Sequence, residues 1–241
     1  MRSFRMGFPW IAGLAFVITL ACTSAKTYAQ ERAQPIRKHE LWVSLDVEGG
    51  LPKVFKDLLG KDLYKRFKLA AELGYRSDDV FYAPRQVYTD LGANFKLNGH
   101  FDIGVVQRIS FRPEDNTKHR TSLQLNFDTK WKRFGLEYRL GYQHNYTEFG
   151  SAREMVRNKF SLSYDFKNFK FDPEISTEFF TWVGYQGIQH TSTRHSIGTS
   201  YSLSKAHKIS FKLIHDRDHG VAWPTYRWIY SIGYALDLRD L

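Results

Sequence analysis

The sequence predicts an all-β fold, an antiparallel up-and-down transmembrane β-barrel of about 10–12 strands with a polar lumen and an apolar face toward lipid. Three observations lead to this prediction. Apolar and polar residues alternate over long stretches, glycines share the face of the charged residues, and aromatic residues collect near predicted strand ends. The chain has 241 residues, of which 16% are aromatic, so it is long enough for one large domain.

The first 29 residues have the layout of a secretory signal peptide. Arg2 and Arg5 precede an apolar run, and the small-residue stretch TSAKTYAQ follows it. We expect cleavage after Ala29, which leaves residues 30–241 as a single barrel domain in the outer membrane of a Gram-negative bacterium. An uncleaved anchor is the alternative, and the proline and glycines within the run disfavour it.

The only cysteine, Cys22, lies in this leader. It is either a lipidation site or a residue removed with the leader, and the second interpretation is favoured because Thr19 stands where a lipoprotein leader has leucine. The mature chain then has no thiol or disulfide chemistry.

The chain is basic, with a formal charge of +10. Its lysines and arginines are interleaved with acids along the predicted strands and form no recognition block, so we expect no nucleic-acid partner. The expected partners are outer-membrane lipid and a small polar solute, and no cofactor is expected.

Alternation with period two predicts about eleven strands, close in length to tilted membrane-spanning strands of roughly ten residues. They are expected at residues 39–48, 64–76, 85–97, 100–112, 119–131, 133–146, 155–166, 168–182, 194–204, 207–217 and 225–238. Residues 51–65 differ, because apolar residues recur there at helical spacing and predict a short amphipathic helix. A cap packed against a barrel end is its favoured role, and a partner-binding helix is the alternative.

The connections between the predicted strands alternate in length. The tight turns are Asn98-Gly99, Lys132-Arg133, Lys167-Asn168 and Lys205-Ala206, and the long stretches are FRPEDNTKH, NYTEFGSARE, TWVGYQGIQHTST and HDRDHGVAWP. Short turns on the periplasmic side and long loops outside are typical of outer-membrane barrels. An odd number of strands would start the first strand outside, so either a strand is missed or residues 30–38 pass through or around the barrel.

Glycine indicates which face is the interior. On a solvated outer face glycine only weakens a strand, whereas in a crowded lumen it lets a long side chain approach the backbone. The glycines on the charged face are Gly74, Gly92, Gly104, Gly135, Gly141, Gly198 and Gly233. The charged face is therefore predicted to line the lumen, with Phe160, Leu162 and Tyr164 among the residues facing lipid.

The predicted lumen residues carry both signs of charge in similar numbers. They include Arg76, Arg108, Arg120, Glu137, Arg139, Arg157, Lys159, Asp165, Asp172, Glu174, Glu178 and Arg227. Two roles stay open for them. They form either a network of ion pairs that plugs the interior or the lining of a narrow polar pore.

A lipid hydrolase at the barrel rim is the enzymatic alternative to a non-enzymatic barrel. His190 and Ser192 would share one face of an extended strand, where the imidazole activates the hydroxyl. The next hairpin, SYSLSKAHKIS, offers no carboxylate or Asn to orient the histidine, so the non-enzymatic interpretation is favoured. His215 and His219 belong to no metal-ligand pattern, and no metal site is expected.

The succession VYTDLGANFKLNGHFDIGVVQRISFR, HRTSLQLNFDTKWKRFGLEYRLGYQHNY, RNKFSLSYDFKNFKFDPEISTEFF and RHSIGTSYSLSKAHKISFKL resembles an uncharacterised outer-membrane β-barrel family of Bacteroidota, the domain of unknown function 2490 type. The shared features are the alternation, a second strand ending in GYR at Arg76 and a strand containing Pro-Glu. The resemblance implies a barrel and supplies no reaction. The helix-like insert at residues 51–65 departs from the short turn expected there.

Overall fold

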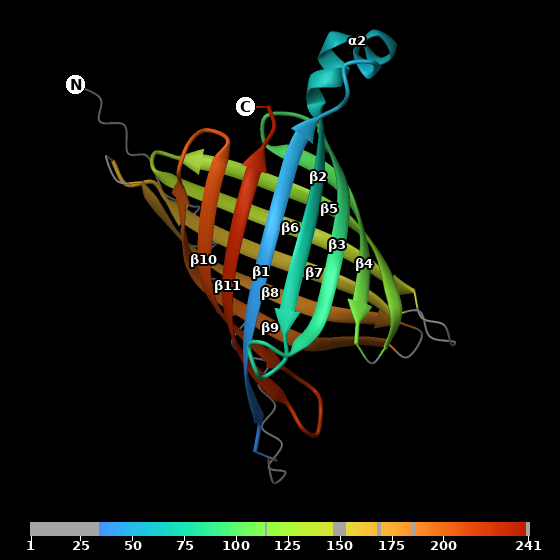
Figure 1. Ribbon diagram of the computed structural model, residues 1–241, viewed down its shortest axis with the longest axis vertical. Coiled ribbons are helices and arrows are strands. Elements are labelled where there is room, and N and C mark those ends of the chain that lie inside the picture. Colours follow the sequence, from blue (N-terminus) through green and yellow to red (C-terminus); the bar gives the residue numbers. More distant parts are fainter. Residues whose placement is uncertain (1–33, 114, 147–152, 168–169, 185–186, 240–241) are drawn as a thin grey trace, which may run out of the picture. The chain divides into compact units, whose positions relative to one another are not determined.

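The computed structural model describes residues 34–239 except 114, 147–152, 168–169 and 185–186, so the predicted leader and Cys22 lie outside it. The described residues form one closed barrel of eleven strands with one helix (Figure 1). The elements are β1 (Ile36–Gly50), α2 (Phe55–Arg66), β2 (Phe67–Ser77), β3 (Pro84–Lys96), β4 (Phe101–Arg112), β5 (Asp115–Trp131), β6 (Phe134–Tyr146), β7 (Arg153–Tyr164), β8 (Phe171–Gly184), β9 (Gly187–Ser202), β10 (His207–Asp218) and β11 (Thr225–Asp237).

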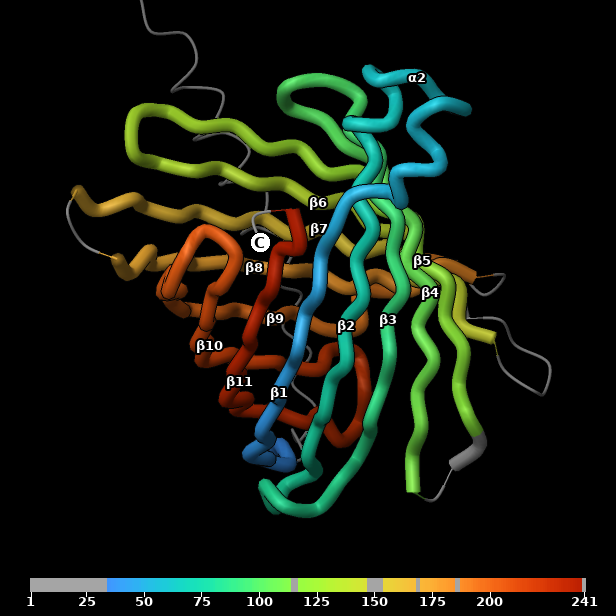
Figure 2. The backbone as a smooth tube through the Cα atoms, turned by 45° about the horizontal axis from the view of Figure 1, so that its top comes forward, coloured from blue at the N-terminus to red at the C-terminus, as the bar shows by residue number. Residues whose placement is uncertain are grey.

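The barrel closes through an unusual pair of strands. β1 is antiparallel to β2 on one side and parallel to β11 on the other, in a register that runs from Ile36 opposite Thr225 to Glu48 opposite Asp237. Figure 2 shows β1 between these two strands. In an up-and-down chain with an odd number of strands, the first and last run in the same direction. The described residues therefore contain no missed strand, and residues 36–38 belong to β1.

The two ends of the barrel differ in their connections. The turn end carries α2 and the connections after β3, β5, β7 and β9, whereas the loop end carries those after β2, β4, β6, β8 and β10. Two predicted long loops are mostly strand, because β4 and β5 extend to Arg112 and from Asp115, and β8 and β9 extend to Gly184 and from Gly187. Backbone pairing continues in these hairpins beyond the point where apolar and polar residues stop alternating. Polar composition therefore predicted loops that are longer than the real ones.

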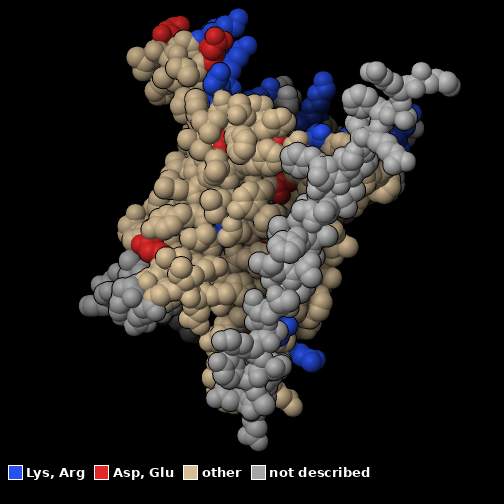
Figure 3. Space-filling view, turned by 180° about the vertical axis from the view of Figure 1, so that it is seen from behind, with Lys and Arg blue, Asp and Glu red and all other residues tan. Residues whose placement is uncertain are grey.

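Side-chain exposure is inverted relative to a soluble barrel. Among the described residues, twelve polar or charged residues are buried against five hydrophobic ones, and the buried polar set includes Asp90, Arg108 and Glu178. Large apolar residues are exposed instead, such as Leu123 at 55% and Ile197 at 59%. Figure 3 shows a mostly uncharged barrel wall, with lysine and arginine gathered near the turn end.

Aromatic pairs surround the turn end on the outer face. Their ring centroids lie about 5 Å apart, a normal separation for packed rings. The pairs are Phe67–Phe95 at 4.8 Å, Phe101–Phe127 at 5.0 Å, Phe134–Tyr164 at 4.9 Å and Phe171–Tyr201 at 4.9 Å. A similar contact, Phe81–Tyr230 at 5.6 Å, lies at the loop end.

The helix α2 is where the sequence predicted one, but its predicted role as a packed cap is wrong. None of its residues is buried, and its apolar Leu58 is 79% exposed. Gly60 interrupts it with a φ of 75°, in the left-handed region that favours glycine, so the apolar side chains do not form one continuous face. Among the described residues, no helix is long and apolar enough to cross a membrane.

Candidate functional site in the barrel lumen

The structure places the predicted lumen residues on the inner face of their strands, with one exception. Cross-strand register puts Arg139 opposite Lys159, Lys159 opposite Glu178 and Arg227 opposite the inward-facing Asp216. The inward positions are Arg76, Arg108, Arg120, Glu137, Arg139, Arg157, Lys159, Asp172, Glu174, Glu178 and Arg227. Asp165 instead lies in the turn after β7, where its backbone N–H donates to the carbonyl of Arg133.

Arginines alternate with aromatic rings across the loop-end half of the lumen. Each guanidinium carbon lies between 3.7 and 5.0 Å from the centroid of a neighbouring ring, within the range of cation–π attraction. In order, this arginine–aromatic stack is Arg108, Tyr88, Arg76, Trp42, Arg194, Phe180 and Arg157. Since the stack runs from β4 through β1 to β9 and β7, it crosses the interior of the barrel.

Carboxylates pair with three arginines of the stack, Arg108 and Arg157 at its ends and Arg194 within it. Asp90 accepts two hydrogen bonds from Arg108, at 2.6 and 2.5 Å, and Glu178 accepts one from Arg157 at 2.8 Å. Arg194 donates to Asp216 at 2.8 Å. Buried charges persist in proteins when they are paired and hydrogen-bonded in this way. The loop-end half of the lumen therefore matches the predicted ion-pair plug.

Glu40 is the most enclosed acid of this plug, with no exposed surface. Its carboxylate accepts hydrogen bonds from the Trp42 indole at 2.9 Å and from Arg85 at 2.7 Å, and it lies 3.4 Å from the Arg227 guanidinium. Arg85 sits where the register between β2 and β3 shifts, since Ser77 pairs with residue 84 and Arg76 with residue 86. A β-bulge of this kind redirects a side chain, and here the Arg85 side chain reaches the buried acid.

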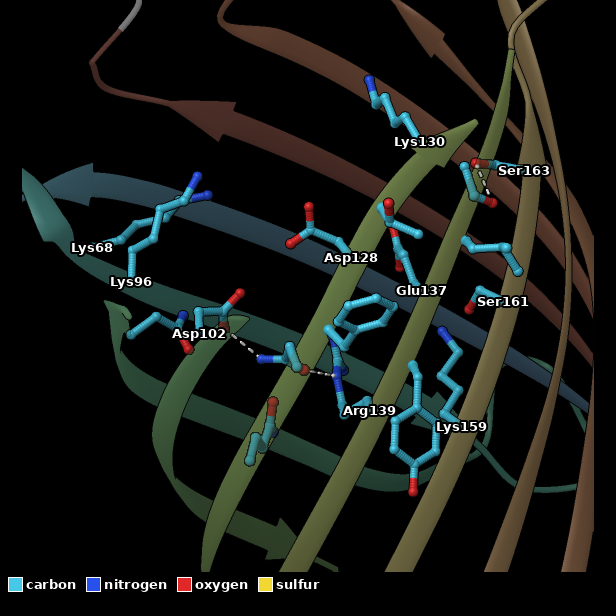
Figure 4. Close-up of a pocket in the computed structure, with 18 of the residues that line it drawn as sticks. Lys68, Lys96, Asp102, Asp128, Lys130, Glu137, Arg139, Lys159, Ser161 and Ser163 are labelled. Atoms are coloured by element: carbon cyan, nitrogen blue, oxygen red, sulfur yellow. Dashed lines mark hydrogen bonds between the residues drawn. The ribbon is translucent and has the colours of Figure 1, made fainter. Parts of the chain in front are cut away.

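The turn-end half of the lumen is hollow. A vestibule of about 510 Å³ opens there, and Figure 4 shows Lys68, Lys96, Lys130 and Lys159 around it. Lysines and arginines outnumber carboxylates in its lining, so the vestibule is positively charged. Asn126 donates to Asp102 at 2.7 Å and accepts from Arg139 at 2.8 Å, as dashed lines in Figure 4 mark.

A smaller inner cavity of about 250 Å³ follows the vestibule toward the middle of the barrel. Asn94, Gln124 and Arg139 line both spaces, so the two cavities adjoin each other. The inner cavity also touches Arg108 and Arg157, which belong to the arginine–aromatic stack. The two cavities together extend from the turn end of the lumen to the stack.

His190 and Ser192 do not come together as a catalytic pair. A register shift in β9 leaves Thr191 unpaired, so Ser192 is opposite the inward Phe180 while His190 is opposite the outward residue 181. The His190 imidazole contacts the Thr193 hydroxyl at 2.9 Å, and His219 contacts the same hydroxyl at 3.0 Å. The bulge removed the shared face on which the hydrolase hypothesis depended.

No group of three or more His, Cys, Asp and Glu side chains in the described ranges is arranged to hold a metal. The predicted lumen set also left out several residues of the plug, namely Glu40, Trp42, Arg85, Tyr88, Phe180, Arg194 and Asp216. A signal for the aromatic residues among them exists in the sequence, because each of these aromatic residues interrupts the polar face of its strand.

Residues 38–223 match the family described as protein of unknown function (DUF2490). The chain belongs to the DUF2490 family. The match extends from within β1 to the connection before β11, so it includes the strands that carry the complete arginine–aromatic stack. No curated protein matches this DUF2490 chain.

Proposed function

We propose that this DUF2490 protein is a non-enzymatic outer-membrane barrel that works as a narrow, closed pore. Its lumen takes up small polar solutes at the turn end, and the arginine–aromatic stack closes the loop end. The observation that supports membrane placement best is the inverted exposure of the barrel wall, since lipid stabilises a band of exposed Leu, Ile and Phe around a closed barrel.

Two further features support membrane placement. The outer aromatic pairs at the turn end are positioned like the aromatic girdles that outer-membrane barrels place at the lipid headgroups. An apolar hollow of about 510 Å³ on the outer face of β3–β6, lined by Phe95, Ile103 and Leu125, suits an acyl chain. The predicted signal peptide provides the export route.

Membrane placement is tested by fractionation and by heat-modifiable migration on gels. Recovery in the outer-membrane fraction, with a mobility shift on boiling, supports the proposal, and recovery in the soluble periplasm contradicts it. For orientation, we expect a single cysteine at Val221, in the β10–β11 connection, to react with an impermeant maleimide on intact cells. One at Asn98, in the β3–β4 turn, should react only after permeabilisation.

The role as a narrow pore is tested by liposome swelling against lipid deacylation with purified protein. We expect low permeability and no deacylation. Rapid phospholipid hydrolysis that depends on Ser192 would support the rim hydrolase instead.

A further inference from the structure

The charges around the inner cavity are sorted by wall rather than mixed. Register pairs Asp46 with Glu72, Glu72 with Asp90, Asp90 with Arg108 and Arg108 with Arg120, in one continuous row. Three acids on β1–β3 are thus followed by arginines on β4 and β5. All five residues line the inner cavity. Asp90 and Arg108 neutralise each other where the two series meet.

The basic wall ends in two arginines without a carboxylate. In the part of the chain that the structure describes, neither Arg120 nor Arg139 forms an ion pair, although both line the inner cavity. Arg120 has a buried Nε with no hydrogen-bond partner, and Arg139 is bonded to the neutral amide of Asn126. Arg120 is a partly buried guanidinium without a counter-charge, which is costly, and Arg139 adds a more exposed cation to the same cavity. This wall therefore favours an anionic group.

The acidic wall has carboxylates without a basic partner. Asp46 and Glu72 are directly opposite each other on β1 and β2, and within the described residues neither forms an ion pair. Asp46 accepts from the Ser44 hydroxyl at 3.1 Å, and Glu72 accepts from the Tyr88 hydroxyl at 2.5 Å. Two facing carboxylates repel each other, and a cation between them relieves that repulsion.

The two walls are joined by β3 and β4, which lie between Glu72 on β2 and Arg120 on β5. Their outer members are nearly opposite in the ring of eleven strands, because four strands separate Asp46 on β1 from Arg139 on β6 in one direction and five in the other. The vestibule connects the space between them to the turn end through Asn94 and Gln124. A simple anion in the inner cavity is repelled by the acidic wall, and a simple cation is repelled by the basic vestibule through which it enters. A molecule that carries both charges satisfies both walls.

We propose that the inner cavity is a binding site for a small zwitterion, with its carboxylate or phosphate on Arg120 and Arg139 and its ammonium on Asp46 and Glu72. The volume of about 250 Å³ limits the ligand to a size near the lower end for ligand pockets. The proposal rests on the proposed function in that it needs a hydrated lumen entered from the turn end.

Three probes of matched skeleton test the proposal by calorimetry on the folded protein in detergent. They are β-alanine, which carries both charges, propionate, which lacks the ammonium, and propylammonium, which lacks the carboxylate. We expect β-alanine to bind more tightly than either singly charged probe, by roughly tenfold or more, because each extra end makes charged hydrogen bonds.

Two variants separate a binding role from a structural one. Arg120→Gln and Asp46→Asn should each weaken β-alanine binding by roughly tenfold, and Asp46→Asn should also strengthen propionate binding, because it removes repulsion from the acidic wall. A merely destabilised barrel would not bind any probe better. The controls Arg217→Gln, on the outer face, and Asp57→Asn, on α2, change charge outside the lumen and should leave binding unchanged.

Equal binding of β-alanine and propionate, with no gain for propionate in Asp46→Asn, would overturn the zwitterion site and indicate an anion site. Absence of binding by all three probes at millimolar concentration would also overturn it. Either result leaves membrane placement standing, because fractionation tests that claim separately, and heat-modifiable migration verifies that each variant is folded.

Discussion

The guanidinium carbon of Arg194 lies 5.0 Å from the ring centroid of Trp42, although their strands, β9 and β1, are not neighbours in the barrel. This contact joins two halves of the arginine–aromatic stack across the lumen. Trp42 also contacts Arg76 at 4.0 Å, and its indole donates to Glu40. The indole therefore joins the two halves of the stack at the point where the stack crosses the interior.

We expect Trp42→Ala to open the loop end and increase solute flux in liposome swelling. The change removes the ring between two arginines and should also destabilise the protein by about 3–5 kcal/mol. Trp228→Ala is the matched control, since Trp228 lies on the outer face. Flux that stays at the wild-type level in a folded Trp42→Ala barrel would show that the stack is not the closure.

Glu40→Gln tests the charge balance of the plug. It removes the carboxylate that Arg85 and Arg227 share, and breaking a buried ion pair costs about 3–5 kcal/mol. The urea midpoint should fall accordingly. Asp57→Asn, on the exposed helix, should change stability by less than about 0.5 kcal/mol. Similar midpoints for both variants would mean that Glu40 is not a required counter-charge.

Gly74→Ala tests the close approach inside the lumen. A Cβ at Gly74 would overlap the ring of Tyr88, whereas a Cβ at Gly141 would meet its nearest neighbour, Arg157, at an ordinary 3.7 Å. Overpacking should cost Gly74→Ala about 1–3 kcal/mol, while Gly141→Ala should be neutral or slightly stabilising. Equal urea midpoints for the two variants would contradict this packing.

The imidazole of His219, in the β10–β11 connection at the loop end, should have a pKa below the usual value for histidine. Burial and the neighbouring His190 lower the pKa of His219. Below the ordinary value of about 6.5 the unfolded chain therefore binds more protons at this site, so the local structure weakens as pH falls through that window. An NMR titration should give a midpoint under the ordinary value, and His190→Asn should raise it. A wild-type midpoint at or above the ordinary value would contradict this environment.

Much of the fold was predictable because alternation with period two is a local signal. The eleven strands, the inward glycines and the outward Phe160 and Leu162 all follow from it. The parallel pairing of β1 with β11 was not predictable, because it joins residues about two hundred positions apart, such as Ile36 and Thr225. The odd number of predicted strands indicated that the first and last strands could not pair in the usual antiparallel way. The structure shows that they pair in parallel.

The candidate site was predictable in composition but not in arrangement. The alternation identified Arg120 and Arg139 as inward residues, yet their lack of carboxylate partners depends on which strands lie across the lumen. His190 and Ser192 illustrate the reverse error. A single bulged residue, Thr191, puts His190 and Ser192 on opposite faces of β9, and the local sequence contains no signal that predicts this bulge.

Whether the apolar face meets lipid is tested most directly by a pair of adjacent substitutions on β7. Leu162 points outward and is 37% exposed, whereas Ser163 lines the vestibule beside Gly135 and opposite Glu174. Each is changed to arginine, the variants are refolded into lipid vesicles, and urea midpoints are compared. Leu162→Arg should lose about 2–4 kcal/mol, because a cation in the hydrocarbon layer has no water or partner. Ser163→Arg should lose far less, because the new charge lies in a hydrated space near Glu174. A severe loss for Ser163→Arg with little loss for Leu162→Arg would contradict the assignment of the faces and the membrane barrel with it.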